Sequence, residues 1–152
     1  MTAGKRRTAR EMAVQMLYQS DLGGSALPHI FATFDLSEYL AGDVGRHKRR
    51  VEDAFQYAQT LVRGTVDHRE EIDAMIRGQA DNWRLERMPA VDRNILRLAI
   101  YEMLHERDTP KLVVVDEAIE LAKKFGSEQS GRFVNGLLDG LLKQHSFPGS
   151  LT

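Results

Sequence analysis

The stretch that decides the fold is Pro89–Leu104, PAVDRNILRLAIYEML. Within its last ten residues only Arg97 and Glu102 are charged, and the apolar side chains cover almost every direction at roughly 100° per residue. A helix with this pattern has neighbours on all sides. The leading proline suits a first helical turn, and Asp92 places a negative charge near the positive end of the helix dipole. We therefore predict a central helix around which the other helices pack.

Helical patterns also occupy most of the remaining chain. Apolar residues recur at helical spacing from near Thr8 to Gly23, in 28–34, in Arg50–Asp67, in His68–Ala80, in Val114–Phe125 and in Phe133–Leu141. Trp83, Leu85 and Met88 are expected to be buried connectors that lead into the central helix. The run Leu112–Val115 has the composition of a strand, but no second strand exists to pair with it, and an isolated strand is not viable. We interpret this run as the beginning of a helix, so the sequence predicts an all-α protein of about seven helices.

The first helix has two faces with different expectations. A stripe expected to be buried contains Ala9, Met12, Ala13, Met16 and Ser20. Val14 and Tyr18 lie on the opposite face, among charged residues. Two explanations stay open for them: contact with another part of this chain, or a surface for a partner.

Glycines suggest where the chain turns and where helices approach closely. Ala41–Gly45 is expected to be a loop, and Gly126 is expected to end a helix with a positive φ. Gly136 and Gly140 lie four residues apart in the last helix. Glycine destabilises a helix by about 1 kcal/mol per position, so we expect close packing against a neighbouring helix to compensate.

Composition restricts the class of protein. A chain of 152 residues is long enough for one substantial core, and one domain is the default expectation. There are no cysteines, which excludes disulfides and thiolate metal sites, and no apolar run reaches the roughly 18 residues of a membrane span. The N-terminus is basic but lacks the apolar middle of a signal peptide. We therefore expect a cytoplasmic protein that is not bound to a membrane.

Positive charge is concentrated in two segments. Residues 1–10 form a basic arm that contains Lys5, Arg6, Arg7 and Arg10 and no acid. A second basic run, Arg46–Arg50 (RHKRR), lies at the start of a predicted helix, where cations oppose the helix dipole. From the residues alone this second run is either solvated or functional.

No motif of a catalytic or metal site is present. The five histidines are scattered, and the sequence contains no HExxH pattern and no glycine-rich phosphate loop with its lysine. The acids Asp116, Glu117 and Glu120 are explained by pairing with Lys123 and Lys124 along one helix face. We therefore expect no enzyme activity, no cofactor and no bound metal.

Three segments resemble a known family. RRTAREMAVQMLYQ near the start, AVDRNILRLAIYEML in the centre and VVDEAIELAKKFGSEQSGRFVNGLLD near the end are similar, in this order and at these separations, to the NusB family of bacterial transcription antitermination factors. The resemblance implies two small helical lobes within one domain, about residues 8–67 and 68–143. It implies an RNA-binding factor rather than a catalyst.

The resemblance also implies partners and site residues. Family members pair with a small-subunit ribosomal protein, called NusE in this role, and the pair binds boxA RNA and helps RNA polymerase to read through terminators during ribosomal RNA synthesis. RNA contacts are expected at Lys5, Arg6, Arg7, Arg10 and Phe133, and contacts to NusE at Tyr18, Glu86 and Asp92.

Departures and alternatives accompany these expectations. Thr8 stands where relatives can have another arginine, and Gln129 stands where many have an acid. A NusB-like domain also begins some ribosomal RNA cytosine methyltransferases, but this chain is expected to have no room for the methyl-transfer domain. The other alternative is a helical protein-interaction module without nucleic-acid binding, in which the basic arm is only solvated. For Phe133 the spacing to Leu137 equally predicts a core position.

Overall fold

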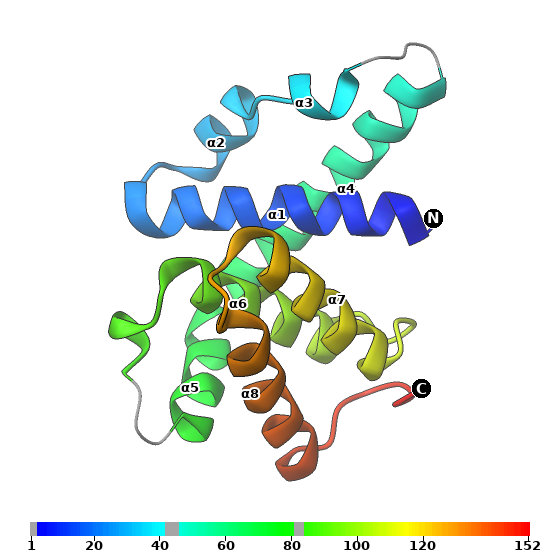
Figure 1. Ribbon diagram of the computed structural model, residues 1–152. Helices are drawn as coiled ribbons and strands as arrows, with labels where there is room; N and C mark the ends of the chain where they lie inside the picture. The colour runs from blue at the N-terminus through cyan, green and yellow to red at the C-terminus, as the bar shows by residue number, and fades with distance from the viewer. Residues whose placement is uncertain (1–2, 42–45, 81–83) are drawn as a thin grey trace. The chain divides into compact units, whose positions relative to one another are not determined.

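The computed structural model describes residues 3–41, 46–80 and 84–152, and these are helical with no strand (Figure 1). In chain order the elements are α1 (Ala3–Gly23), α2 (Leu27–Thr33), α3 (Ser37–Leu40), α4 (Arg46–Asp67), α5 (Arg69–Gln79), the 3₁₀ turn η1 (Leu85–Arg87), α6 (Ala90–His105), α7 (Lys111–Phe125) and α8 (Ser130–Gln144). The all-α prediction is confirmed. Most of the expected loop Ala41–Gly45, and the expected burial of Trp83, lie outside the described residues. None of the described helices is long and apolar enough to cross a membrane.

The chain forms two compact units that meet in sequence between Arg63 and Gly64. The first unit contains α1, α2, α3 and most of α4, and the second contains the last turn of α4 and all later elements.

Helix α6 is the central helix of the second unit, as predicted. It packs against α5, α7 and α8, and every residue from Asp92 to Ile100 is buried. Pro89 is the residue immediately before the helix, where its missing N–H costs no hydrogen bond. Leu85 and Met88, just upstream, are buried as expected.

A buried ion pair fixes α5 against α6, and the sequence analysis did not foresee it. The Arg97 guanidinium donates from Nε to Asp73 Oδ1 at 2.8 Å and from Nη2 to Asp73 Oδ2 at 3.1 Å. Its Nη1 donates to Asn94 Oδ1 at 3.2 Å. Both charged residues are nearly inaccessible to water, so the Asp73 carboxylate compensates the buried positive charge of Arg97.

The start of α1 differs from the expectation. The helix begins at Ala3 rather than near Thr8, so the basic arm is not a separate segment but the first turns of α1. Lysine, arginine and alanine are good helix formers, and an ion pair from Lys5 Nζ to Asp53 Oδ2 of α4, at 3.2 Å, anchors the first turn. The expected buried stripe is confirmed for Ala9, Met12, Ala13 and Met16. Ser20 is only half-buried.

Tyr39 of α3 connects to α1 within the first unit. Its hydroxyl accepts a hydrogen bond from Gln15 Nε2 at 2.8 Å and donates to Glu11 Oε1 at 3.5 Å. Burial, together with the charge of Glu11, raises the pKa of Tyr39 to about 12, which keeps the hydroxyl protonated. Its carbonyl oxygen accepts from His47 Nε2 at 2.8 Å, so α3 also holds the start of α4.

The run Leu112–Val115 lies in the first turns of α7, which confirms its interpretation as helix. The C-terminal residues cover this start: Lys111 N–H donates to Ser150 O at 3.0 Å, and Leu112 N–H donates to Leu151 O at 2.9 Å. Two N–H groups that a helix leaves unpaired are thereby satisfied.

Two glycine predictions were only partly right. Gly126 follows α7 with φ −95° and ψ −168°, which is extended rather than left-handed. Glycine is needed at this position because there is no room for a side chain: a Cβ there would lie 2.6 Å from Ser130 Cβ. Gly136 faces open space, so no neighbour approaches it, whereas a Cβ on Gly140 would overlap the Gln79 side chain of α5. Only Gly140 has the predicted close neighbour.

Candidate nucleic-acid interface

The first candidate surface is the α1 basic turn, which we define as Lys5, Arg6 and Arg7. Helical geometry places these three cations on successive sides of the first turns, with no acid between residues 3 and 10. Arg7 is exposed, and Lys5 and Arg6 are half-buried. The turn can therefore present positive charge over a broad arc of the helix surface, which suits contact with phosphates.

Arg10 does not share this exposure. Only 3% of its surface is accessible, because it follows Ala9 on the buried side of α1. A guanidinium in this position has little surface for a phosphate. Lys5, Arg6 and Arg7 therefore keep accessible surface for an anion, whereas Arg10 occupies a packing position.

The second candidate surface is the α7–α8 corner in the other unit, which contains Phe133. The ring of Phe133 is half-buried, so neither the predicted core position nor full exposure describes it. It lines a hollow of about 610 Å³ with Glu128, Gln129 and Arg132. Gln129, the departure noted above, is the exposed residue that precedes α8. A partly exposed aromatic ring beside a cation can accept a stacked base.

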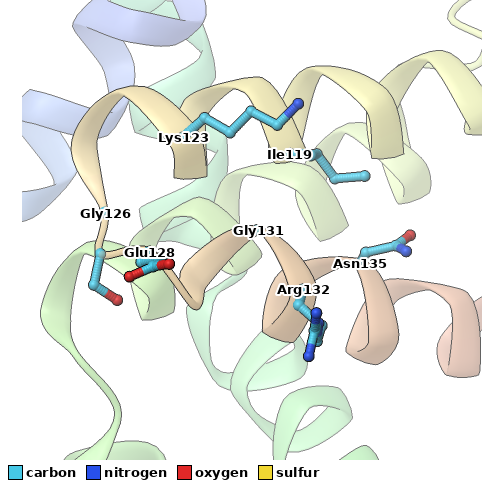
Figure 2. Close-up of a pocket in the computed structure, with 8 residues that line it drawn as sticks. Ile119, Lys123, Gly126, Glu128, Gly131, Arg132 and Asn135 are labelled. Atoms are coloured by element: carbon cyan, nitrogen blue, oxygen red, sulfur yellow. The ribbon is translucent and has the colours of Figure 1, made fainter.

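A neighbouring pocket of about 570 Å³ shares Glu128 and Arg132 with this hollow (Figure 2). Lys123 and Ile119 project from α7, Arg132 and Asn135 project from α8, and Glu128 lies in the turn between the helices. Lys123 Nζ is paired with Glu120 Oε1 at 3.4 Å. Arg132 is exposed and contributes to both hollows. The sequence analysis missed Arg132, although a cation directly before Phe133 was a visible signal.

The three residues expected to contact NusE differ in exposure. Tyr18 is 39% exposed on α1, whereas Val14, on the same expected outer face, is buried. Glu86 is exposed in η1, and its Oε1 lies 3.6 Å from Arg77 Nη2. A hydrogen bond from its own backbone N–H, with the charges of Arg77 and Arg84, holds the pKa of Glu86 below its usual range.

Asp92 is buried, and its Oδ1 has no hydrogen-bond partner within the described ranges. It lies in the first turn of α6, where a negative charge is favourable, as predicted. A partner protein could contact little of the Asp92 side chain, because that side chain is buried. Tyr18 and Glu86 are therefore accessible at the surface, whereas Asp92 is not.

Nothing in the described part of the chain resembles a metal site. No group of three or more histidine or acidic side chains is arranged to hold an ion there.

Comparison with known proteins identifies close relatives. The sequence profile described as the NusB family matches residues 7–143. The chain is 43% identical to the transcription antitermination protein NusB of Myxococcus xanthus over 90% of this chain and 93% of that one. It is 47% identical to NusB of Geobacter sulfurreducens over 90% and 92% of the two chains.

Solved structures agree with these sequence relatives. NusB of T. maritima superposes with a TM-score of 0.74 at 38% identity, over 92% of both chains. A second structure holds the antitermination factors NusB and NusE in complex with double-stranded RNA, and its matching chain has a TM-score of 0.74 at 30% identity, over 95% of this chain and 100% of that one.

Proposed function

Because the chain belongs to the NusB family of transcription antitermination proteins, we propose that it binds boxA RNA together with the ribosomal protein NusE. In this role it acts with RNA polymerase in the cytoplasm while ribosomal RNA is transcribed. The proposal assigns RNA contact to the α1 basic turn and to Phe133. It assigns partner contact to Tyr18 in the first unit and to Glu86 in the second.

The observation that carries the proposal is the placement of cations at the start of α1. Cations at a helix N-terminus oppose the helix dipole, so they weaken the helix unless an anion compensates. Lys5 forms an ion pair with Asp53 of α4, so one carboxylate of the protein lies among the cations at this helix start. Phosphates of an RNA strand would supply the remaining negative charge. A solved structure that resembles this chain holds NusB and NusE in complex with double-stranded RNA, which supports an RNA-binding role in general.

Electrostatics alone would give weak binding. Three cations on three phosphates of a single strand give a log–log salt slope of about −2.1, which is roughly a twenty-fold loss of affinity between 50 and 200 mM salt. Non-specific affinity of this kind is typically about 10⁻⁴–10⁻⁶ M at physiological salt. Base stacking on Phe133 and contacts from NusE are therefore needed for tight binding.

The first prediction concerns the variant Arg6→Gln/Arg7→Gln, titrated with labelled boxA RNA in the presence of NusE. Loss of two phosphate contacts should flatten the salt slope by about 1.4, which lowers affinity roughly 25-fold at 0.1 M salt. Wild-type protein without NusE should bind the same RNA much more weakly. Association with NusE, measured without RNA, should not change.

Two results would contradict the proposal. Equal RNA affinity and an equal salt slope for the variant and the wild type would remove the α1 basic turn from the RNA site. No salt-dependent RNA binding by the wild-type pair would instead favour the protein-interaction module. Arg10 stays unchanged in this design because its buried position makes substitution a test of folding.

The second prediction concerns Tyr18→Ala. Because Tyr18 is exposed, loss of its ring should leave the melting temperature within about 2 °C of wild type, as surface substitutions usually do. Tyrosines are frequent among the residues that dominate interface energy. The association with NusE should weaken about tenfold or more, which isothermal titration calorimetry measures directly.

Gln19→Ala is the matched control, since Gln19 is the next residue on the same exposed part of α1. It should leave NusE binding nearly unchanged. A large drop in melting temperature for Tyr18→Ala with normal NusE binding would identify Tyr18 as a packing residue.

A further inference from the structure

The second basic run, Arg46–Arg50, lies beside the α1 basic turn. It forms the first turn of α4, and a hollow of about 230 Å³ separates the two helices. From α1 the lining residues are Gly4, Lys5 and Thr8, and from α4 they are His47, Arg50 and Val51. Two basic segments that are 40 residues apart in the sequence therefore share one small site within the first unit.

Charge in and around the hollow is not balanced by the protein. Lys5 pairs with Asp53, and Lys48 pairs loosely with Glu52 at 4.0 Å. Arg49 and Arg50 are exposed, and neither forms an ion pair or hydrogen bond within residues 3–41, 46–80 and 84–152. These cations repel one another, and the N-terminal end of the α4 dipole also favours an anion. The site is therefore complementary to a negatively charged group.

Fixed hydrogen bonds position the polar groups of the hollow. A backbone carbonyl only accepts, so the bond from His47 Nε2 to Tyr39 O places a proton on Nε2. The Lys5–Asp53 pair fixes α1 against α4 at the same end. At about 30 Å³ per water molecule, a volume of about 230 Å³ has room for one phosphate group with part of its hydration.

We propose that the hollow between the starts of α1 and α4 binds one phosphate of the RNA backbone, with Arg50 as its main cation and Lys5 and Thr8 on the opposite wall. The inference rests on the proposed RNA-binding function and extends the RNA path from the α1 basic turn onto α4. The chemistry is a phosphodiester held by a guanidinium and a hydroxyl, which fixes the strand without reading its sequence.

Arg50→Gln and Arg49→Gln form a matched pair of tests. Both arginines are exposed, adjacent and without an ion pair in the described structure, but only Arg50 lines the hollow. With boxA RNA and NusE, Arg50→Gln should flatten the log–log salt slope by about 0.7, which lowers affinity about five-fold at 0.1 M salt. Arg49→Gln should change the slope by less than half as much. Arg50→Lys should restore most of the loss because it keeps the charge.

A truncation series locates the phosphate on the RNA. The RNA should be shortened from each end until Arg50→Gln and wild type bind equally, since a strand that no longer reaches the hollow cannot distinguish them. An Arg50→Gln protein with wild-type affinity and salt slope for full-length RNA would overturn the inference. Equal effects of the two glutamine variants would also overturn it, because the basic run would then act only through its overall electrostatic field and not through a phosphate site in the hollow.

The outcomes separate this inference from the proposed function. If Arg6→Gln/Arg7→Gln weakens RNA binding while Arg50→Gln does not, the RNA function stands and the α4 site is wrong. If neither variant affects RNA binding, both are wrong. If Arg50→Gln weakens NusE association in the absence of RNA, the hollow belongs to a protein interface and the phosphate site is again wrong.

Discussion

Replacing Asp73 with alanine is expected to lower the free energy of unfolding by about 3–5 kcal/mol. Asp73 accepts two hydrogen bonds from the buried Arg97 guanidinium, at 2.8 and 3.1 Å. Without the carboxylate, the buried Arg97 guanidinium would keep its charge but lose both of these charge-assisted hydrogen bonds. The penalty arises from the loss of the carboxylate beside a buried charge rather than from lost packing. Urea unfolding followed by circular dichroism measures it.

Two further variants test that explanation. Arg69→Ala removes a half-exposed partner, 3.5 Å from Asp73 Oδ2, and should cost no more than about 1 kcal/mol. The double variant Asp73→Leu/Arg97→Met replaces both charges with apolar groups and should recover most of the stability that Asp73→Ala loses. A double variant as unstable as Asp73→Ala would show that the site needs its ion pair for packing. A loss below about 1 kcal/mol for Asp73→Ala would contradict a buried charge at Arg97.

Much of the fold was predictable because the dominant signal is local. Helices α4, α7 and α8 bury side chains at a spacing close to 3.6 residues, and this period is visible in the sequence without any knowledge of neighbours. The same reasoning explains why Leu112–Val115 was assigned correctly: a strand needs a partner, and none was available. The positions of the two basic segments could also be read directly from the sequence.

The rest depended on contacts between segments distant in sequence. The start of α1 at Ala3 is anchored partly by Asp53, which local propensity cannot reveal. Arg10 and Asp92 were assigned to surfaces from their place in a motif, but their burial depends on what packs around them. The hollow between α1 and α4 has the same origin, since only the folded chain brings Lys5 and Arg50 to one site.

Leu98→Ala is expected to lower the free energy of unfolding by about 2–5 kcal/mol. Leu98 lies in the middle of α6 and is only 1% exposed. Alanine removes the buried transfer free energy of three carbon atoms and leaves a cavity that helices α5, α7 and α8, packed around α6, cannot fully close. At about 2–4 °C per kcal/mol for a chain of this size, the melting temperature should fall by roughly 4–20 °C.

Leu112→Ala provides the control for this cavity argument. Leu112 belongs to the same unit but is 41% exposed, so the same chemical change should alter stability by no more than about 0.5 kcal/mol. The two variants together separate burial from residue type. If Leu98→Ala had a urea midpoint equal to that of wild type, α6 would not be the centre of the core. If Leu112→Ala were equally destabilising, burial would not explain the loss caused by Leu98→Ala, because Leu112→Ala keeps the backbone bond from Leu112 N–H to Leu151 O.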